Sequence, residues 1–404
     1  LLLLMSLISN RLSRFKPSLT VKISQKAREL SMMGEKIISL SSGEPDFDTP
    51  EHIKSEAISA INEGFTKYTQ VDGVKELKES IQRKFLKENN LKYSINQITV
   101  GVGGKHVIYN LFMSSIDQGD EVVIASPYWV SYPDIVSLCR GKPVLIESDS
   151  KNKFKITPDM LEKNINKNTK WFVINSPCNP TGTVYSREEL IEISKVLINN
   201  PHVNILSDDI YEHIIYGNKK FYNILNVAPE LYERTFIVNG VSKAFSMTGW
   251  RIGYGAGDEK LIKSIAKIQS QSTTNPCSIS QMAAKFALDT KKTFLNDWIK
   301  QFEERKNFLI DFFNPIKQFE VINPEGAFYL FIGCEGFMRK KTPDGKIISN
   351  DVDFSEFILT DSKVAIVPGI AFGKSPYFRI SYATSLDDLR LACERIKGSV
   401  SKIL

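Results

Sequence analysis

Two cations lie eight residues apart in a stretch of the sequence that holds little other polar bulk. Lys243 stands near the start of the run VSKAFSMTGWRIGYG (241–255), and Arg251 stands shortly before two glycines. A lysine held within reach of an aldehyde forms a Schiff base with it, and an arginine binds a phosphate through parallel hydrogen bonds. The pair therefore predicts a site for a ligand that carries both an aldehyde and an anionic group.

Further polar and aromatic side chains follow other apolar runs. Each of these runs reads as a buried strand, and ligands in parallel sheets bind at the carboxyl ends of the strands. The residues found there are Trp129, Asn179, Asp208 and Tyr211, and a short strand nearer the C-terminus carries Arg379.

A glycine run offers a second way to bind an anion. In GVGGKH (101–106) the backbone N–H groups of Gly103, Gly104 and Lys105 would open a helix, and helix N-termini bind phosphate. The run completes neither a P-loop nor G-x-G-x-x-G, and neither HExxH nor G-x-S-x-G occurs. The four histidines have no metal-ligand spacing, so we expect no metal site.

Taken together, these residues fit pyridoxal 5′-phosphate. Asp208 would hold the protonated ring nitrogen, Asn179 and Tyr211 would donate to the ring oxygen, and Trp129 would stack on the ring. Lys243 would form the Schiff base that the cofactor's electron-sink chemistry requires. Each residue alone has a plainer interpretation, as a solvated cation, a core aromatic or a helix cap. Their joint occurrence at strand ends favours the cofactor.

The elements that must position these residues alternate between strands and helices. Such alternation is typical of an α/β domain with a mostly parallel sheet. A helix is predicted at 186–198, with Ser186 as its N-cap and Glu189 three positions later. Runs rich in Val and Ile predict buried strands at 121–126, 171–176, 203–208 and 235–240.

The last hundred residues show a different pattern, which predicts a smaller α+β domain. A charged helical stretch spans about 295–313, short strands follow at 326–332, 363–369 and 377–383, and a helix ends the chain. We therefore expect an N-terminal segment (1–48) that packs with the small domain, a large cofactor-binding domain (49–295) and a small C-terminal domain (296–404).

Composition excludes several other classes of protein. The 404 residues are 42% hydrophobic and carry a net charge of +6 without a basic block, so no nucleic-acid partner is expected. Five widely spaced cysteines without a CxxC favour a reducing cytoplasm. The apolar N-terminus is too short for a membrane span and lacks the features of a signal peptide, and we expect Met5 to be the natural start.

From about Ser13 to the C-terminus, the sequence resembles the fold-type I enzymes that use pyridoxal phosphate. Within them it is similar to class I aminotransferases of the bacterial aspartate and aspartate/prephenate subgroup. The stretches that carry the resemblance include SSGEPDFDTPEHI, FTKYTQVDG, NSPCNPTGTVY, SDDIYEHI, VNGVSKAFSMTGWRIGYG and FRISYATS. The resemblance implies a large domain with a mostly parallel seven-stranded sheet, a smaller α+β domain, and a homodimer with active sites at the subunit interface.

The resemblance also implies a role for each site residue. Lys243, Asp208 and Tyr211 would be catalytic. The cofactor would be bound by these three together with Gly103, Gly104, Lys105, Trp129, Asn179, Ser242 and Arg251, and by Tyr68 of the neighbouring subunit. The substrate would be bound by Gly43, Trp129, Asn179, Arg379 and Lys105, with Lys16 and Thr20 from the N-terminal segment. Asp209 stands where relatives have Glu, and Gly240 stands where some have a second phosphate-binding serine.

The activity implied is transfer of the amino group of L-aspartate to 2-oxoglutarate. Prephenate is a further expected substrate, with Lys16 near its ring-borne carboxylate. Two alternatives remain open at this point: another reaction of the same fold, such as β-elimination by a lyase, and a ligand-sensing regulator. The regulator is disfavoured because no helix-turn-helix pattern or basic patch precedes the fold.

Overall fold

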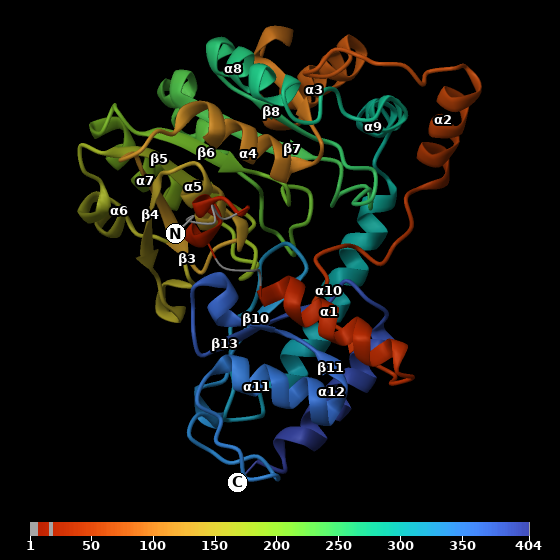
Figure 1. The fold of residues 1–404 in the computed structure, drawn as a ribbon, viewed down its shortest axis with the longest axis vertical. Coiled ribbons are helices and arrows are strands. Elements are labelled where there is room, and N and C mark those ends of the chain that lie inside the picture. The colour runs from red at the N-terminus through yellow and green to blue at the C-terminus, as the bar shows by residue number, and fades with distance from the viewer. Residues whose placement is uncertain (1–6, 16–18, 404) are drawn as a thin grey trace, which may run out of the picture.

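The structure is a computed structural model, and it describes residues 7–15 and 19–403. A seven-stranded sheet fills the upper part of the molecule (Figure 1). Its strand order is β2-β8-β7-β6-β5-β3-β4. The strands are β2 (Ile98–Gly101), β3 (Glu121–Ser126), β4 (Lys142–Glu147), β5 (Thr169–Asn175), β6 (Asn204–Asp208), β7 (Thr235–Gly240) and β8 (Gly253–Ala256).

Every neighbouring pair in this sheet is parallel except those that involve β8, which is antiparallel to β2 and β7. The mostly parallel α/β architecture predicted from the sequence is thus confirmed. Strands β2, β4 and β8 were not among the runs predicted as strands. The sequence of β8 is GYGA, in which glycine replaces the branched residues typical of a strand. A Cβ atom on Gly253 would lie 2.1 Å from the backbone nitrogen of Gly104, so the close approach of helix α4 requires glycine here.

Helices cover both faces of the large sheet. They are α2 (Glu51–Asn62), α3 (Lys75–Asn89), α4 (Gly104–Ser115), α5 (Ser131–Leu138), α6 (Pro158–Asn164), α7 (Arg187–Asn199), α8 (Glu259–Ser270) and α9 (Ser278–Asp289). Helix α7 begins as predicted, because the Ser186 hydroxyl accepts a hydrogen bond from the Glu189 N–H and the Glu189 carboxylate accepts one from the Ser186 N–H.

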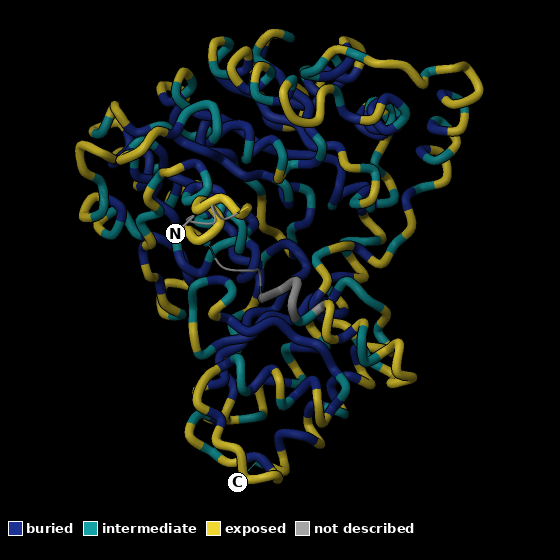
Figure 2. Tube along the Cα trace, viewed as in Figure 1, coloured by how far each residue is buried: buried dark blue, intermediate teal, exposed yellow. Residues whose placement is uncertain are grey.

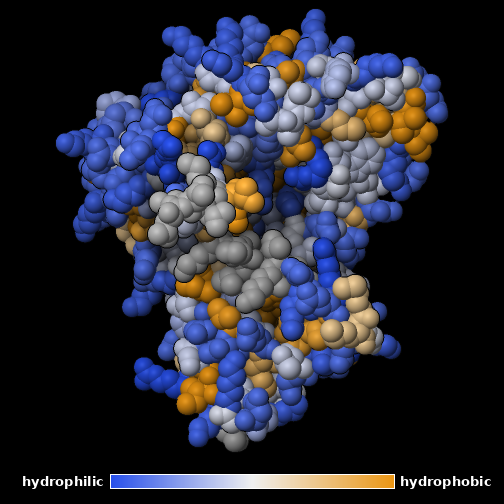
Figure 3. Space-filling view, viewed as in Figure 1, coloured by the Kyte–Doolittle hydropathy of each residue, from blue (hydrophilic) through white to orange (hydrophobic). Residues whose placement is uncertain are grey.

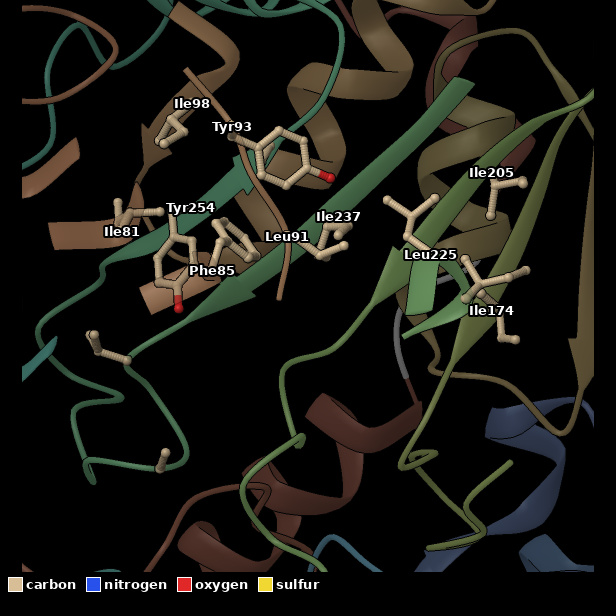
Figure 4. Packing of buried hydrophobic residues seen from close by; sticks show 14 of the residues in the cluster. Ile81, Phe85, Leu91, Tyr93, Ile98, Ile174, Ile205, Leu225, Ile237 and Tyr254 are labelled. Carbon is tan, nitrogen blue, oxygen red and sulfur yellow. The ribbon is translucent and has the colours of Figure 1, made fainter. Parts of the chain in front are cut away.

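Alternate side chains of each central strand enter different cores. Val123 packs with α3, α7 and α9 on one face of the sheet, whereas Val122 and Ile124 pack with α4, α5 and α8 on the other. Figure 4 shows part of the first core, where Phe85 lies beside Tyr254. The central strands β5, β6 and β7 are almost entirely buried, as Figure 2 shows for the middle of the upper part, whereas the edge strand β4 is largely exposed or half-buried. This burial on both faces explains the continuous apolar runs in the sequence.

The lower part holds two small sheets. Strands β9 (Glu320–Val321), β10 (Tyr329–Gly333), β12 (Val367–Pro368) and β13 (Tyr377–Ser381) form one in the order β12-β13-β10-β9, and β1 (Ile38–Ser39) pairs in parallel with β11 (Val364–Ala365). The helices of this part are α1 (Leu19–Met32), α10 (Phe294–Phe313), α11 (Asp351–Phe357) and α12 (Leu386–Val400).

The N-terminal residues contact both parts of the molecule. Helix α1 and strand β1 contact strands of the lower part, whereas the short helix η1 (Asn10–Arg14) lies against α5 of the upper part. The division at residues 48 and 295 stays a prediction. Each helix within the described residues is too short or too polar to cross a membrane.

Candidate active site

A cavity opens at the carboxyl ends of β5, β6 and β7, where the upper part meets β10 and β13 of the lower part. This is the place that the sheet topology predicts for a ligand. The predicted site residues that line it are Gly43, Gly104, Lys105, Trp129, Asn179, Asp208, Tyr211, Ser242, Lys243, Arg251 and Arg379.

Lys243 lies in the turn that follows β7. Its Nζ atom donates a hydrogen bond to the backbone oxygen of Gly43 and lies 5.9 Å from the ring centroid of Tyr211. Burial lowers the pKa of Lys243 to about 8, and the neighbouring Arg379 adds to this effect. Near neutral pH about a tenth of this amine is therefore unprotonated, far more than for an ordinary lysine, and this is the form that attacks a carbonyl carbon.

Asp208 is the last residue of β6, and its side chain lines the cavity. Its Oδ2 atom accepts a hydrogen bond of 2.5 Å from the hydroxyl of Tyr132. Burial raises the pKa of Asp208 to about 6, although the Tyr132 hydrogen bond acts in the opposite direction. A cation placed beside this carboxylate would relieve the cost of its burial.

Asp209 points away from the cavity. Its carboxylate accepts hydrogen bonds from the Ser207 hydroxyl and the Asn223 amide, and it is not among the lining residues. Adjacent residues of an extended chain point to opposite sides, so these two neighbouring carboxylates are directed to different places.

Asn179 and Arg379 are joined at the side of the cavity formed by the lower part. An Nη1 donor of Arg379 lies 2.9 Å from the Asn179 side-chain oxygen, and an Nη2 donor lies 2.7 Å from the backbone oxygen of Ser41. Arg379 is 3% exposed, yet its Nε atom has no hydrogen-bond partner among the residues that the structure describes. A buried donor without a partner is costly, so this arginine is suited to an anionic ligand.

Arg251 and the glycine run lie together on the upper side. Gly103 is the N-cap of α4 with φ of 83°, and a Cβ atom on it would lie 2.3 Å from Nη2 of Arg251. The positive φ favours glycine here, and the missing side chain leaves space for the guanidinium beside the start of the helix. Arg251 itself has φ of 57°, a conformation that residues other than glycine adopt rarely and that occurs at functional sites.

Lys105 brings a second positive charge to the upper side of the cavity, next to the ring of Trp129. The Nζ atom of Lys105 lies 5.1 Å from the Trp129 ring centroid. Burial lowers the pKa of Lys105, and Arg251 lowers it further. Trp129 is also the residue whose flat ring was predicted to lie against the cofactor.

Four predicted residues are not among those that line the cavity. Gly103 caps α4 beside Arg251. Tyr68 is 90% exposed. Lys16 lies outside the described residues. Thr20 lies in α1, but its side chain is outside the description.

The sequence reasoning missed several residues that the fold brings to the cavity. Tyr132 reaches Asp208 from the first turn of α5, Asn175 ends β5, and Tyr329 comes from β10. A signal existed for Asn175, because it directly follows an apolar run, as Asp208 does. The contacts of Tyr132 and Tyr329 join segments 76 and 118 residues apart, and no local pattern identifies them.

The donor set fits pyridoxal 5′-phosphate. The cavity presents a partly deprotonated amine at Lys243, a buried carboxylate at Asp208, and an anion site where Arg251 meets the N-terminus of α4. Arg379 adds an unpaired buried donor for a substrate carboxylate. These are the groups that an aldehyde, a pyridine nitrogen, a phosphate and an amino acid require.

Comparison with known proteins gives the same picture over nearly the whole chain. The family model described as aminotransferase class I and II matches residues 35–396. A probable aspartate/prephenate aminotransferase of Rickettsia felis is 54% identical over 400 residues, which are 98% of each chain. The crystal structure of the aspartate aminotransferase from Rhizobium meliloti is 46% identical with a TM-score of 0.95, covering 99% of this chain and 100% of that one. Aspartate aminotransferase from Thermus thermophilus with maleate is 37% identical with a TM-score of 0.91, covering 98% of this chain and 100% of that one.

Proposed function

Because the chain belongs to the family of class I and II aminotransferases, we propose that it transfers the amino group of L-aspartate to 2-oxoglutarate, giving oxaloacetate and L-glutamate. The enzyme uses pyridoxal 5′-phosphate and acts on amino and 2-oxo acids, as its family does. The observation that carries the choice of aspartate is the presence of two cations, Arg379 and Lys105, in the cavity that also holds Lys243.

The residues of the upper part would hold the cofactor. Arg251, Ser242 and the backbone of 103–105 would bind its phosphate, and Trp129 would cover its ring. Asp208 would accept a hydrogen bond from the ring nitrogen, and Asn179 and Tyr211 would donate to the ring oxygen. When bound, the cofactor supplies an electron sink for the negative charge that develops at the substrate Cα atom.

Lys243 would move the proton in this reaction. With the cofactor bound, the amine of Lys243 would take the proton from the substrate Cα atom and would hold it as an ammonium until the proton is given back. The lowered pKa of Lys243 supports this role, because only the neutral amine can accept a proton. The fixed carboxylate of Asp208 would keep the ring nitrogen protonated throughout.

Arg379 and Lys105 would fix the substrate from two sides. The Nε donor of Arg379 suits the α-carboxylate, and a bidentate contact that also used an Nη group would orient the Cα–H bond toward Lys243, with Gly43 leaving room for the substrate. The ammonium of Lys105 would bind the side-chain carboxylate of aspartate. This second cation favours a dicarboxylic substrate over an apolar amino acid.

Prephenate is proposed as a second oxo-acid substrate, converted to arogenate. The name of the Rickettsia felis relative includes prephenate. Lys16 is the residue proposed for the distant carboxylate of prephenate, and Thr20 is proposed to assist Lys105 at the carboxylate of aspartate. A segment near the N-terminus could close over the cavity and exclude water. Two points support prephenate as a substrate: the likeness to that relative, and the need of a ring-borne carboxylate for a further cation.

We also propose a homodimer that functions in the cytoplasm. Exposed apolar side chains on α2, among them Ile58 and Ile61, support a subunit contact there, as does the 90% exposure of Tyr68 shortly after that helix. Figure 3 shows hydrophobic residues gathered over α2 on an otherwise mostly hydrophilic face. In the dimer Tyr68 would reach the cofactor phosphate of the neighbouring subunit. Five free cysteines are compatible with a reducing compartment.

A product assay tests the proposal. The purified enzyme is given a panel of amino donors with 2-oxoglutarate, and then a panel of 2-oxo acids with aspartate. Aspartate should be the preferred donor, and oxaloacetate should form in step with glutamate. Pyruvate and ammonia from a β-substituted amino acid would instead identify a lyase.

The prephenate arm uses the same assay with arogenate as the product. Lys16→Ala should reduce the use of prephenate about 10- to 100-fold more than the use of oxaloacetate, the loss expected for one charge-assisted hydrogen bond. Lys195→Met, which alters an exposed lysine of α7, is the control. Absence of arogenate with the wild-type enzyme would remove prephenate from the proposal and leave aspartate transamination in place.

A further inference from the structure

Tyr329 lines the cavity, yet none of the roles assigned above involves it. It is the first residue of β10 and is fully buried. Its hydroxyl lies 2.7 Å from the hydroxyl of Tyr211, and its ring centroid lies 4.4 Å from the central carbon of the Arg379 guanidinium. Tyr329 therefore contacts both a residue assigned to the cofactor and the residue assigned to the substrate carboxylate.

The strand pairing of the lower part fixes this arrangement. Arg379 on β13 pairs with Phe331 on β10, and Tyr329 lies two residues earlier, so it shares the face of the sheet that carries Arg379. The ring of Tyr211 meets that of Tyr329 edge to face at 84°. A Cβ atom on Gly43 would lie 3.0 Å from the Tyr329 hydroxyl, so the glycine leaves space for it.

The direction of the hydrogen bond follows from proton counting. Each phenol has one proton, and either hydroxyl could donate along the Tyr211–Tyr329 line. If Tyr211 donates its proton to the cofactor ring oxygen, the proton on that line must come from Tyr329. Successive hydrogen bonds of this kind strengthen one another in a buried site.

We propose that Tyr329 is a positioning residue that donates to Tyr211, and so directs the Tyr211 proton to the cofactor ring oxygen, while its ring supports Arg379. This inference rests on the function proposed above and extends it to a residue with no assigned role. The two parts of the Tyr329 side chain have separate roles: the hydroxyl acts on the cofactor through Tyr211, and the ring packs against Arg379.

The other titratable and charged groups around Tyr211 stay the same when the Tyr329 hydroxyl is removed. They are Asp208 on the same turn, Tyr132 from α5, Lys243 from the turn after β7, and Arg379 from β13. A hydrogen-bond donor to the ring oxygen stabilises the deprotonated form of the Lys243-bound cofactor. Loss of the Tyr329 hydroxyl should therefore move the pH midpoint of its absorbance change upward.

The test compares cofactor-loaded Tyr329→Phe and Tyr329→Leu with the wild-type enzyme. Absorbance is titrated with pH, and the KM for L-aspartate is measured in parallel. Tyr329→Phe should raise the titration midpoint by about 0.5 to 1 pH unit and leave the KM within about 2-fold of wild type. Tyr329→Leu should raise the midpoint similarly and the KM by about 5-fold or more, because it also removes the ring beside Arg379. Tyr382→Phe alters another fully buried tyrosine of the lower core that does not line the cavity, and it should change neither quantity.

Two results would overturn the inference. One is a Tyr329→Phe enzyme whose absorbance change has the same pH midpoint as that of the wild type. The other is a Tyr329→Phe enzyme whose KM for L-aspartate rises as much as that of Tyr329→Leu. A wild-type enzyme that forms no cofactor chromophore would refute the proposed function itself. Failure of the proposed function can therefore be distinguished from failure of the role inferred for Tyr329.

Discussion

The hydroxyl of Tyr132 lies 2.5 Å from Oδ2 of Asp208, and both side chains are buried. This contact joins α5 to the end of β6 and fixes the carboxylate proposed to hold the cofactor ring nitrogen. It also favours the ionised carboxylate, because the hydrogen bond lowers the pKa of Asp208 against the effect of burial. Asp208 thus remains charged at a depth where an unsupported carboxylate would tend to be neutral.

Tyr132→Phe should therefore weaken the hold of Asp208 on the cofactor. Without the hydrogen bond, the pKa of Asp208 in the cofactor-free protein rises further above 6, so the pH below which cofactor binding weakens should move up by about one pH unit. The affinity of the cofactor-free protein for the cofactor is measured against pH, with Tyr254→Phe as a control in a buried tyrosine of β8. An unchanged pH dependence of cofactor binding in Tyr132→Phe would contradict this role.

Asp208 and Asp209 should differ strongly in their effect on turnover. Asp208→Asn replaces the carboxylate with a neutral amide that cannot stabilise a protonated ring nitrogen, so kcat should fall by about 100-fold or more. Asp209→Asn alters a side chain held by Ser207 and Asn223 outside the cavity, and kcat should fall by less than about 10-fold. Steady-state kinetics with aspartate and 2-oxoglutarate decide the matter, and the reverse ranking would refute the assignment.

The cofactor-free protein should show the cost of burying Asp208. Its folded-state pKa of about 6 lies above the ordinary value of 3.8, so its contribution to stability is fully present below about pH 4 and is lost as the pH rises through 6. Asp208→Asn removes this loss, which amounts to about 3 kcal/mol.

Thermal unfolding of the cofactor-free proteins at pH 5 and pH 8 measures the effect. The midpoint of Asp208→Asn relative to wild type should be higher at pH 8 than at pH 5. Asp311→Asn on the exposed side of α10 should show no such difference between the two pH values. A variant less stable than wild type by the same amount at both pH values would show that the carboxylate is not strained by burial.

The sequence identified the central strands because they are buried on both faces and consist of Val and Ile. It also pointed to Asp208 and Lys243, which both line the cavity, since a residue at a strand end can be found by counting along one segment. It did not locate Tyr132 or Tyr329, whose contacts depend on how α5 and β10 fold back over the sheet. Strand β8 was not predicted from the sequence, because the close approach of α4 requires glycine at position 253 and glycine has a low strand propensity.

Lys105 should determine the preference for a second carboxylate. Lys105→Met keeps an unbranched side chain beside Trp129 and removes the charge, so kcat/KM for aspartate should fall by about 10- to 100-fold. The same constant for alanine, which has no side-chain carboxylate, should change by less than about 3-fold. Equal losses for the two donors would show that Lys105 serves the cofactor alone.

The central claim is that Lys243 and its bound cofactor carry an amino group from aspartate to an acceptor in two separate half-reactions. The most direct test mixes the cofactor-loaded enzyme with L-aspartate in the absence of any 2-oxo acid and measures the product formed per active site. The wild-type enzyme should release about one equivalent of oxaloacetate and then stop until 2-oxoglutarate is added, and Lys243→Ala should release none. Continued release of pyruvate or ammonia without an acceptor, or an equal yield from Lys243→Ala, would contradict the account.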